Sequence, residues 1–138
     1  MTLLRGALLY QALSLGLVGI WALFFPNHFY SSFPGFGMQW ISADGAFNEH
    51  LVGDVGSLNL GIACATIYAL ISRNHGAATG SGIAALVYST PHFFYHLHHI
   101  KTLPTVLEQG LNMALLGGNL IIAIIIMIKG LYDKKSLA

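Results

Sequence analysis

Four long apolar segments dominate the 138-residue chain, and their lengths limit the structures that it can form. A helix needs about 20 predominantly apolar residues to cross the hydrocarbon core of a bilayer. The segments cover approximately residues 3–25, 47–71, 77–100 and 105–129. We therefore predict an all-α fold: a single domain over residues 1–138 that forms an integral membrane four-helix bundle, with a long outer loop between the first two helices.

The low content of charge supports this class. Charged residues make up 8% of the chain and hydrophobic residues 55%, whereas soluble domains carry roughly 25% charged residues. A soluble fold of this composition would expose large apolar patches. The formal net charge is +1, and the sequence holds no basic stripe or RNA-binding aromatic motif. It therefore predicts the lipid bilayer as a partner and no nucleic acid.

The first apolar segment resembles a secretory signal peptide, because the basic residue Arg5 precedes its apolar region. It is longer than the typical apolar region of such a peptide, and it reaches Pro26 without a small-residue cleavage site. We expect it to be a retained first helix. The loop that follows contains a Pro-Gly-Phe-Gly turn signal at residues 34–37 and an aromatic side chain suited to a membrane interface at Trp40.

The distribution of basic residues predicts the orientation in the membrane. If all four segments cross, five of the six basic residues fall on the side that holds both termini. These residues are Arg5, Arg73, Lys129, Lys134 and Lys135. Only Lys101 falls on the opposite side. Because cytoplasmic loops are enriched in Lys and Arg, we predict that the N- and C-termini are cytoplasmic in a multi-pass protein.

Ionisable side chains gather near the opposite, outer side. In the third segment, His92, His96 and His99 share one helical face, and in the second segment His50 and Asp54 lie one turn apart. Counted at about 1.5 Å per residue from the outer helix ends, the two groups lie at comparable depth. We expect them to meet in one pocket. Pro91 should kink the third helix just before the histidine face.

Imidazoles combined with carboxylates are typical ligands of Zn²⁺, Fe and Cu(II). The sequence therefore predicts a transition-metal site. Its expected ligands are His50, Asp54, His92, His96 and His99. With an open coordination position, such a centre could activate water or O₂ or pass electrons, which would make the protein a membrane oxidoreductase or a metal-dependent hydrolase.

Three other interpretations fit the same residues. The histidines could hydrogen-bond across helices without metal, or one histidine from each of the second and third helices could bind b-type haem. The chain could also be a non-enzymatic accessory or scaffold subunit, either with other membrane subunits or as a homo-oligomer. Asn59 lies opposite Asp54 on the second helix and is expected to hold helices together, and the glycines are expected to allow close helix packing. These glycines are Gly53, Gly56, Gly61, Gly117 and Gly118.

The order of these features resembles that of DoxX-like small four-helix membrane proteins. The shared features are a first helix that ends in Phe24-Phe25-Pro26, a long outer loop, and a glycine-punctuated second helix with the sequence Leu-Val-Gly-Asp-Val-Gly at residues 51–56. The resemblance implies a membrane bundle in or near redox or quinone metabolism. It implies no catalytic residue.

Overall fold

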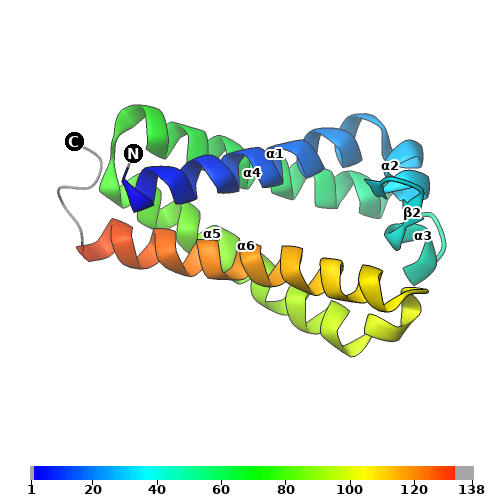
Figure 1. Ribbon diagram of the computed structural model, residues 1–138. Coiled ribbons are helices and arrows are strands. Elements are labelled where there is room, and N and C mark those ends of the chain that lie inside the picture. Colours follow the sequence, from blue (N-terminus) through cyan, green and yellow to red (C-terminus); the bar gives the residue numbers. More distant parts are fainter. Residues whose placement is uncertain (1, 133–138) are drawn as a thin grey trace.

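The computed structural model describes residues 2–132, and this part of the chain is almost entirely helical (Figure 1). The elements are α1 (Leu3–Phe24), α2 (Pro26–Ser32), β1 (Pro34–Gly35), β2 (Met38–Gln39), α3 (Trp40–Asp44), α4 (Glu49–Ser72), α5 (His75–His98), the short 3₁₀ helix η1 (Ile100–Thr102) and α6 (Val106–Tyr132). The four long helices α1, α4, α5 and α6 match the four predicted segments to within one helical turn. The predicted all-α class is confirmed.

Side-chain caps define where the long helices begin. The Asn48 side chain accepts a hydrogen bond from the backbone N–H of Leu51, and Asn74 does the same for Ala77. At the start of α6, the Thr105 hydroxyl oxygen accepts the N–H of Glu108 at 3.1 Å. Each cap satisfies a backbone donor that the first turn of a helix leaves without an intrahelical partner.

The long helices pack as two close pairs, α1 with α4 and α5 with α6. Glycine makes this approach possible, for example, in α4 and in α5: a Cβ atom added to Gly56 of α4 would lie 2.5 Å from the backbone N of Leu23, and one added to Gly82 of α5 would lie 2.7 Å from the backbone N of Met127. The contacts between the pairs are looser, and the pairs separate toward the end of the molecule that carries α2 and α3 (Figure 1).

The opposite end of the bundle is closed by an apolar core. Six fully buried side chains from all four long helices meet there. They are Leu4, Ala7, Leu8, Ala69, Ala78 and Ile126. One turn further along α1, the buried Gln11 amide donates a hydrogen bond to the Thr66 hydroxyl at 2.8 Å, which joins α1 to α4. The apolar core therefore closes this end of the bundle, whereas the other end is wider.

The connection between α1 and α4 (residues 25–48) covers the wider end. The predicted turn at residues 34–37 is confirmed as the tip of a two-stranded hairpin, in which Gly35, Phe36 and Gly37 have positive φ values of 101°, 57° and 82°. The prediction of a long loop missed the two short helices, α2 and α3, that flank this hairpin. These elements place Phe29, Phe33 and Trp40 over the gap between the helix pairs.

Three helices within residues 2–132 are long and apolar enough to cross a membrane, namely α1, α4 and α6. Helix α5 has a similar length but is less apolar, because it carries histidine, serine and threonine side chains and Pro91. The helix continues through Pro91, and the neighbouring Thr90 hydroxyl donates to the Leu86 carbonyl oxygen at 2.8 Å. Pro91 therefore lies inside a continuous α5, and the kink expected just before His92 stays a prediction.

Candidate functional site

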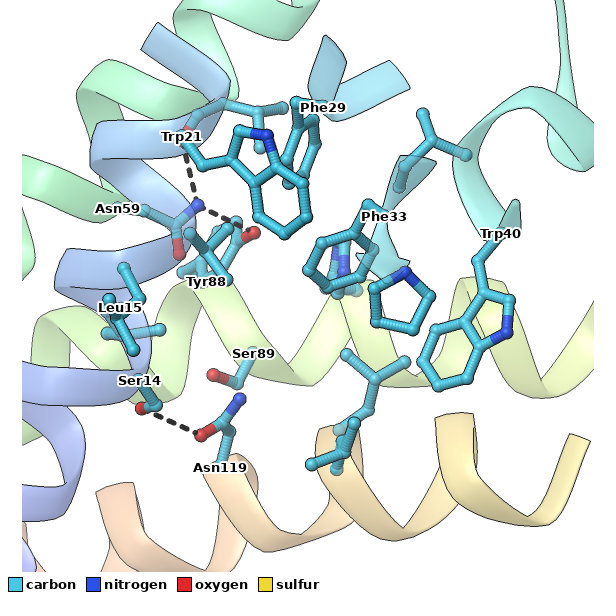
Figure 2. A pocket seen from close by; sticks show the side chains of 18 of the residues that line it. Ser14, Leu15, Trp21, Phe29, Phe33, Trp40, Asn59, Tyr88, Ser89 and Asn119 are labelled. Atoms are coloured by element: carbon cyan, nitrogen blue, oxygen red, sulfur yellow. Dashed lines mark hydrogen bonds between the residues drawn. The ribbon is translucent and has the colours of Figure 1, made fainter. Parts of the chain in front are cut away.

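A cavity of about 770 Å³ lies between the two helix pairs at their wider end (Figure 2). Its walls are mostly apolar and come from all four long helices and from the α1–α4 connection. Aromatic side chains are prominent among the lining residues. These are Tyr10, Trp21, Phe25, Phe29, Phe33, Trp40 and Tyr88, besides two histidines. The volume lies in the range of about 300–1,000 Å³ that is typical of small-molecule pockets.

The pair formed by Asn59 of α4 and Tyr88 of α5 is the best-defined polar element of the wall. The Asn59 side chain is 1% exposed, and its Nδ2 donates to the Val55 carbonyl oxygen at 2.8 Å and to the Tyr88 hydroxyl oxygen at 3.0 Å (Figure 2). Within residues 2–132, Asn59 Oδ1 has no hydrogen-bond donor. This bond confirms that Asn59 joins two helices, and it leaves one acceptor of the pair unused.

Two histidines continue this wall toward the C-terminal end of α5. The His92 ring stacks on the Tyr88 ring with 5.2 Å between centroids, and the His96 ring lies edge-on to His92 at 4.8 Å. Both histidines line the cavity. Their i, i+4 spacing, read from the sequence, correctly placed them on one face, and the structure turns that face toward the space between the helix pairs.

Helix α6 contributes two amides to the opposite wall. Asn112 is buried, and its Oδ1 finds no hydrogen-bond donor in the described part of the chain. Asn119 accepts a hydrogen bond from the Ser14 hydroxyl of α1 at 3.3 Å (Figure 2). The cavity therefore combines an apolar surface with a few polar groups on several helices.

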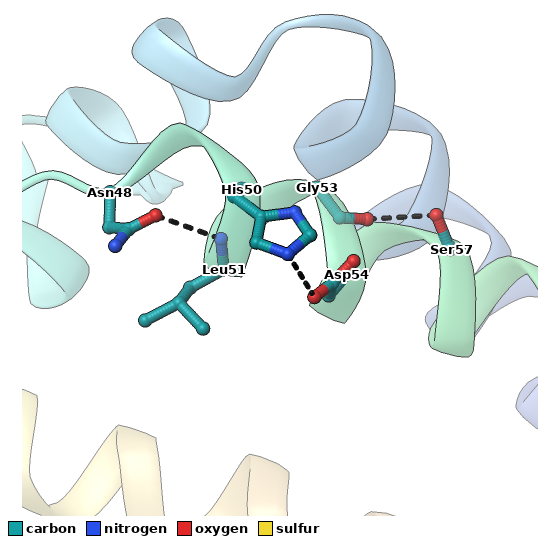
Figure 3. A network of polar contacts seen from close by, with 6 residues as sticks. All are labelled: Asn48, His50, Leu51, Gly53, Asp54 and Ser57. Carbon is teal, nitrogen blue, oxygen red and sulfur yellow. Dashed lines mark hydrogen bonds and ion pairs between the residues drawn. The ribbon is translucent and has the colours of Figure 1, made fainter.

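The five predicted metal ligands do not come together. His92 and His96 line the cavity, whereas the Nδ1 atom of His99 lies 2.8 Å from the Tyr95 carbonyl oxygen one turn back, and its ring stacks on Tyr95. His50 and Asp54 form a 3.5 Å ion pair on the surface of α4, where their side chains are 85% and 62% exposed (Figure 3). Neither residue lines the cavity.

The expected meeting of the α4 and α5 polar faces therefore does not occur, because α4 turns Val52, Val55 and Asn59 toward the cavity instead. Across residues 2–132, no group of three or more His, Cys, Asp or Glu side chains is arranged to hold a metal ion. Zinc, iron or copper binding and b-type haem binding stay predictions. The sequence interpretation treated Asn59 as structural. Its position opposite Asp54 showed that the two side chains lie on different faces of α4, but not which face turns toward the cavity.

One hydrogen bond ties the α1–α4 connection to the second helix pair. The Trp40 indole N–H donates to Glu108 Oε2 at 3.2 Å, and the other oxygen of this carboxylate accepts from the Thr105 hydroxyl at 3.1 Å. Trp40 is buried and lines the cavity. The bond therefore holds one wall of the cavity against the start of α6.

We expect Trp40→Phe and Glu108→Ala to lower the free energy of unfolding non-additively, with a coupling of about 1–2 kcal/mol, because a hydrogen bond to a charged group joins the two side chains. SDS titration of the purified protein in mixed micelles measures this coupling in a double-mutant cycle. Trp21→Phe is the matched control, since the Trp21 indole donates to His28 instead. Additive effects of Trp40→Phe and Glu108→Ala would contradict the proposed tie.

Comparisons with protein-family models, with curated proteins and with solved structures gave no match to this chain. The resemblance to DoxX-like proteins therefore stays a prediction, and the function has to be inferred from the geometry of the cavity.

Proposed function

We propose that this chain is a multi-pass membrane protein that binds a lipophilic small molecule in the cavity between its helix pairs. The observation that carries the proposal is the cavity itself, which combines a volume of about 770 Å³ and a mainly apolar lining with polar groups on α4, α5 and α6. A large apolar pocket with a few convergent polar groups is the usual form of a small-molecule site.

The membrane part of the proposal includes a fourth crossing by α5. Helix α5 packs along α6 and also contacts α4, and both neighbours are long and apolar enough to cross a bilayer. A helix held between two spanning helices lies at the same depth. The basic residues near the helix ends favour cytoplasmic termini, since Arg5 and Arg73 lie at the end opposite Lys101.

The closed end of the bundle favours a binding site over a pore. The apolar core around Leu8 and Ile126 joins all four long helices at that end, and none of its six buried residues lines the cavity. A hydrophilic solute would have to cross this core without a hydrogen-bonding partner, which is costly in a medium of low dielectric constant.

The sides of the cavity indicate where a ligand enters. Its lining includes Leu17 and Ile20 of α1 and Leu115 of α6, and all three side chains are also exposed on the outer surface of the bundle. In a bilayer, this surface faces lipid. A lipophilic molecule can therefore reach the cavity between α1 and α6 directly from the hydrocarbon core, without passing through water.

The two tryptophans of the chain, Trp21 and Trp40, both line the cavity, so their fluorescence reports its occupancy. We expect dibromostearyl alcohol, added to the protein in nanodiscs of non-brominated phosphatidylcholine, to quench this fluorescence with saturation. Bromine quenches at short range, and a ligand held in a site saturates whereas one dissolved in the bilayer does not. Steady-state fluorescence titration measures the effect.

A matched pair of substitutions tests whether the saturable quenching comes from the cavity. Val55 lines the cavity, whereas Val87 faces outward on α5. Val55→Phe should weaken the apparent affinity several-fold because it fills part of the site, and Val87→Phe should leave the affinity unchanged. Quenching that rises linearly with probe concentration, or that responds equally to both substitutions, would overturn the proposed function.

A further inference from the structure

The hydrogen-bonding state of the Asn59–Tyr88 pair limits what the cavity can bind. Asn59 Nδ2 is occupied by the Val55 carbonyl oxygen and the Tyr88 hydroxyl oxygen, which leaves Asn59 Oδ1 as an acceptor without a donor. Tyr88 uses its oxygen as the acceptor of the Asn59 bond, and its own O–H has no acceptor among residues 2–132. One unused acceptor and one unused donor therefore lie on adjacent side chains.

A hydroxyl group complements this arrangement because it donates one hydrogen bond and accepts others. An ester, ether or ketone would accept the Tyr88 hydrogen but would leave Asn59 Oδ1 without a donor. Buried polar groups in proteins are almost always paired, so a ligand that satisfies both atoms has a clear advantage over one that satisfies only Tyr88.

The charge of the lining excludes most ionised head groups. The lining residues include no Lys, Arg, Asp or Glu. A carboxylate or phosphate drawn into the cavity would lose its hydration without gaining a permanent counter-ion. A neutral head group avoids this cost.

Helix α6 provides a second anchor of the same kind. Asn112 lies on α6, while the Asn59–Tyr88 pair is carried by α4 and α5, so the cavity has neutral hydrogen-bonding groups on opposite walls. Asn112 makes no side-chain hydrogen bond to residues of the described range, and its Oδ1 is buried. This position also favours a hydrogen-bond donor on the ligand.

From these observations we infer that the ligand is a neutral lipid alcohol whose hydroxyl group lies between Asn59 Oδ1 and the Tyr88 hydroxyl. The inference rests on the proposed function, because it assigns the chemical class of the ligand that enters the same cavity. The apolar chain of the alcohol then occupies the aromatic part of the cavity, toward Phe29 and Phe33.

Brominated probes that differ only in the head group test this assignment. The test compares dibromostearyl alcohol with its methyl ether and with dibromostearic acid at a pH at which the acid is ionised, each titrated into nanodiscs that contain the full chain. We expect the alcohol to quench Trp21 and Trp40 with an affinity roughly three- to tenfold higher than that of the ether, since one donated hydrogen bond distinguishes them. The ionised acid should bind more weakly than the alcohol.

Two substitutions separate the two hydrogen bonds of the alcohol. Asn59→Leu replaces the amide by an apolar group of similar size and should bring the affinities for alcohol and ether close to equality, because only the alcohol donates to Asn59 Oδ1. Tyr88→Phe deletes only the hydroxyl that both probes can accept from, so it should weaken both affinities and keep the preference for the alcohol. Tyr68→Phe and Asn27→Leu are matched controls at exposed positions outside the cavity, and both should keep the parental preference. A folding defect in Asn59→Leu would remove saturable quenching by both probes, whereas loss of the donated hydrogen bond lowers only the affinity of the alcohol.

The outcomes separate the two proposals. Saturable quenching with equal affinity for alcohol and ether, or tighter binding of the ionised acid, would overturn the assignment of a lipid alcohol and leave the binding cavity in place. A parental preference that persists in Asn59→Leu would also overturn it. Non-saturable quenching by all three probes would overturn the proposed function itself.

Discussion

Replacing Gly56 by alanine should destabilise the protein by about 1–3 kcal/mol, which is the usual cost of forcing extra volume into a packed contact. The added Cβ would lie 2.5 Å from the backbone N and 2.9 Å from the Cα of Leu23. These are backbone atoms of α1, so the clash cannot be relieved by rotating a side chain. The α1–α4 pair has to separate, and the separation also disturbs the cavity wall that the pair forms.

The same substitution at Gly53, one turn away on α4, provides a matched control. A Cβ added there has no neighbouring atom within 4 Å. Alanine has a higher helix propensity than glycine by about 1 kcal/mol, so Gly53→Ala should leave the stability unchanged or raise it slightly. SDS titration in mixed micelles gives both free energies of unfolding. Equal effects at the two positions would contradict the close backbone approach at Gly56.

This contrast shows how far the sequence could predict the packing. All five glycines singled out were expected at close helix contacts. The expectation is confirmed at Gly56 and wrong at Gly53 and Gly61, where the added Cβ would meet nothing within 4 Å. Spacing along a helix shows which residues share a face, but not which face meets another helix. In a soluble protein the apolar face of a helix packs against the core, so the sequence shows which face turns inward.

The same limit explains the outcome for the candidate site. The outer surface of a membrane bundle is as apolar as its interior, so hydrophobicity does not distinguish the inward face from the outward face. On α5 the histidine face of His92 and His96 turns inward, as expected. On α4 the face of His50 and Asp54 turns outward, and Asn59 takes the inward position. Each face was predictable, but not its orientation.

The positions of the long helices were predictable because their apolar length exceeds what any other element requires. The fold of the α1–α4 connection was not. Helices as short as α2 and α3 have too few residues to show a periodic pattern, and their position depends on contacts with distant residues. The bond from Trp40 to Glu108 joins residues 68 positions apart. No local signal at Trp40 identifies this partner.

Cysteine labelling should give an all-or-none answer on the proposed topology, because an impermeant maleimide reacts only with a thiol on its own side of the membrane. The single native cysteine, Cys64, is first replaced by alanine. New cysteines are then placed singly at Phe36, which is 98% exposed at the hairpin tip, at Ser72 in the last turn of α4, and at Thr102 between α5 and α6.

In intact cells we expect Phe36→Cys and Thr102→Cys to be labelled, and Ser72→Cys to be labelled only after permeabilisation. Thr102 decides the role of α5. If α5 crosses the bilayer, Thr102 lies on the same side as Phe36, and if α5 stays on the side of Ser72, Thr102 is protected as well. Protection of Thr102→Cys would therefore mean that the chain crosses the membrane three times. Helix α5, which forms one wall of the cavity, would then lie outside the membrane. Labelling of Ser72→Cys alone would instead invert the orientation predicted from the basic residues, because Arg73 would then lie outside.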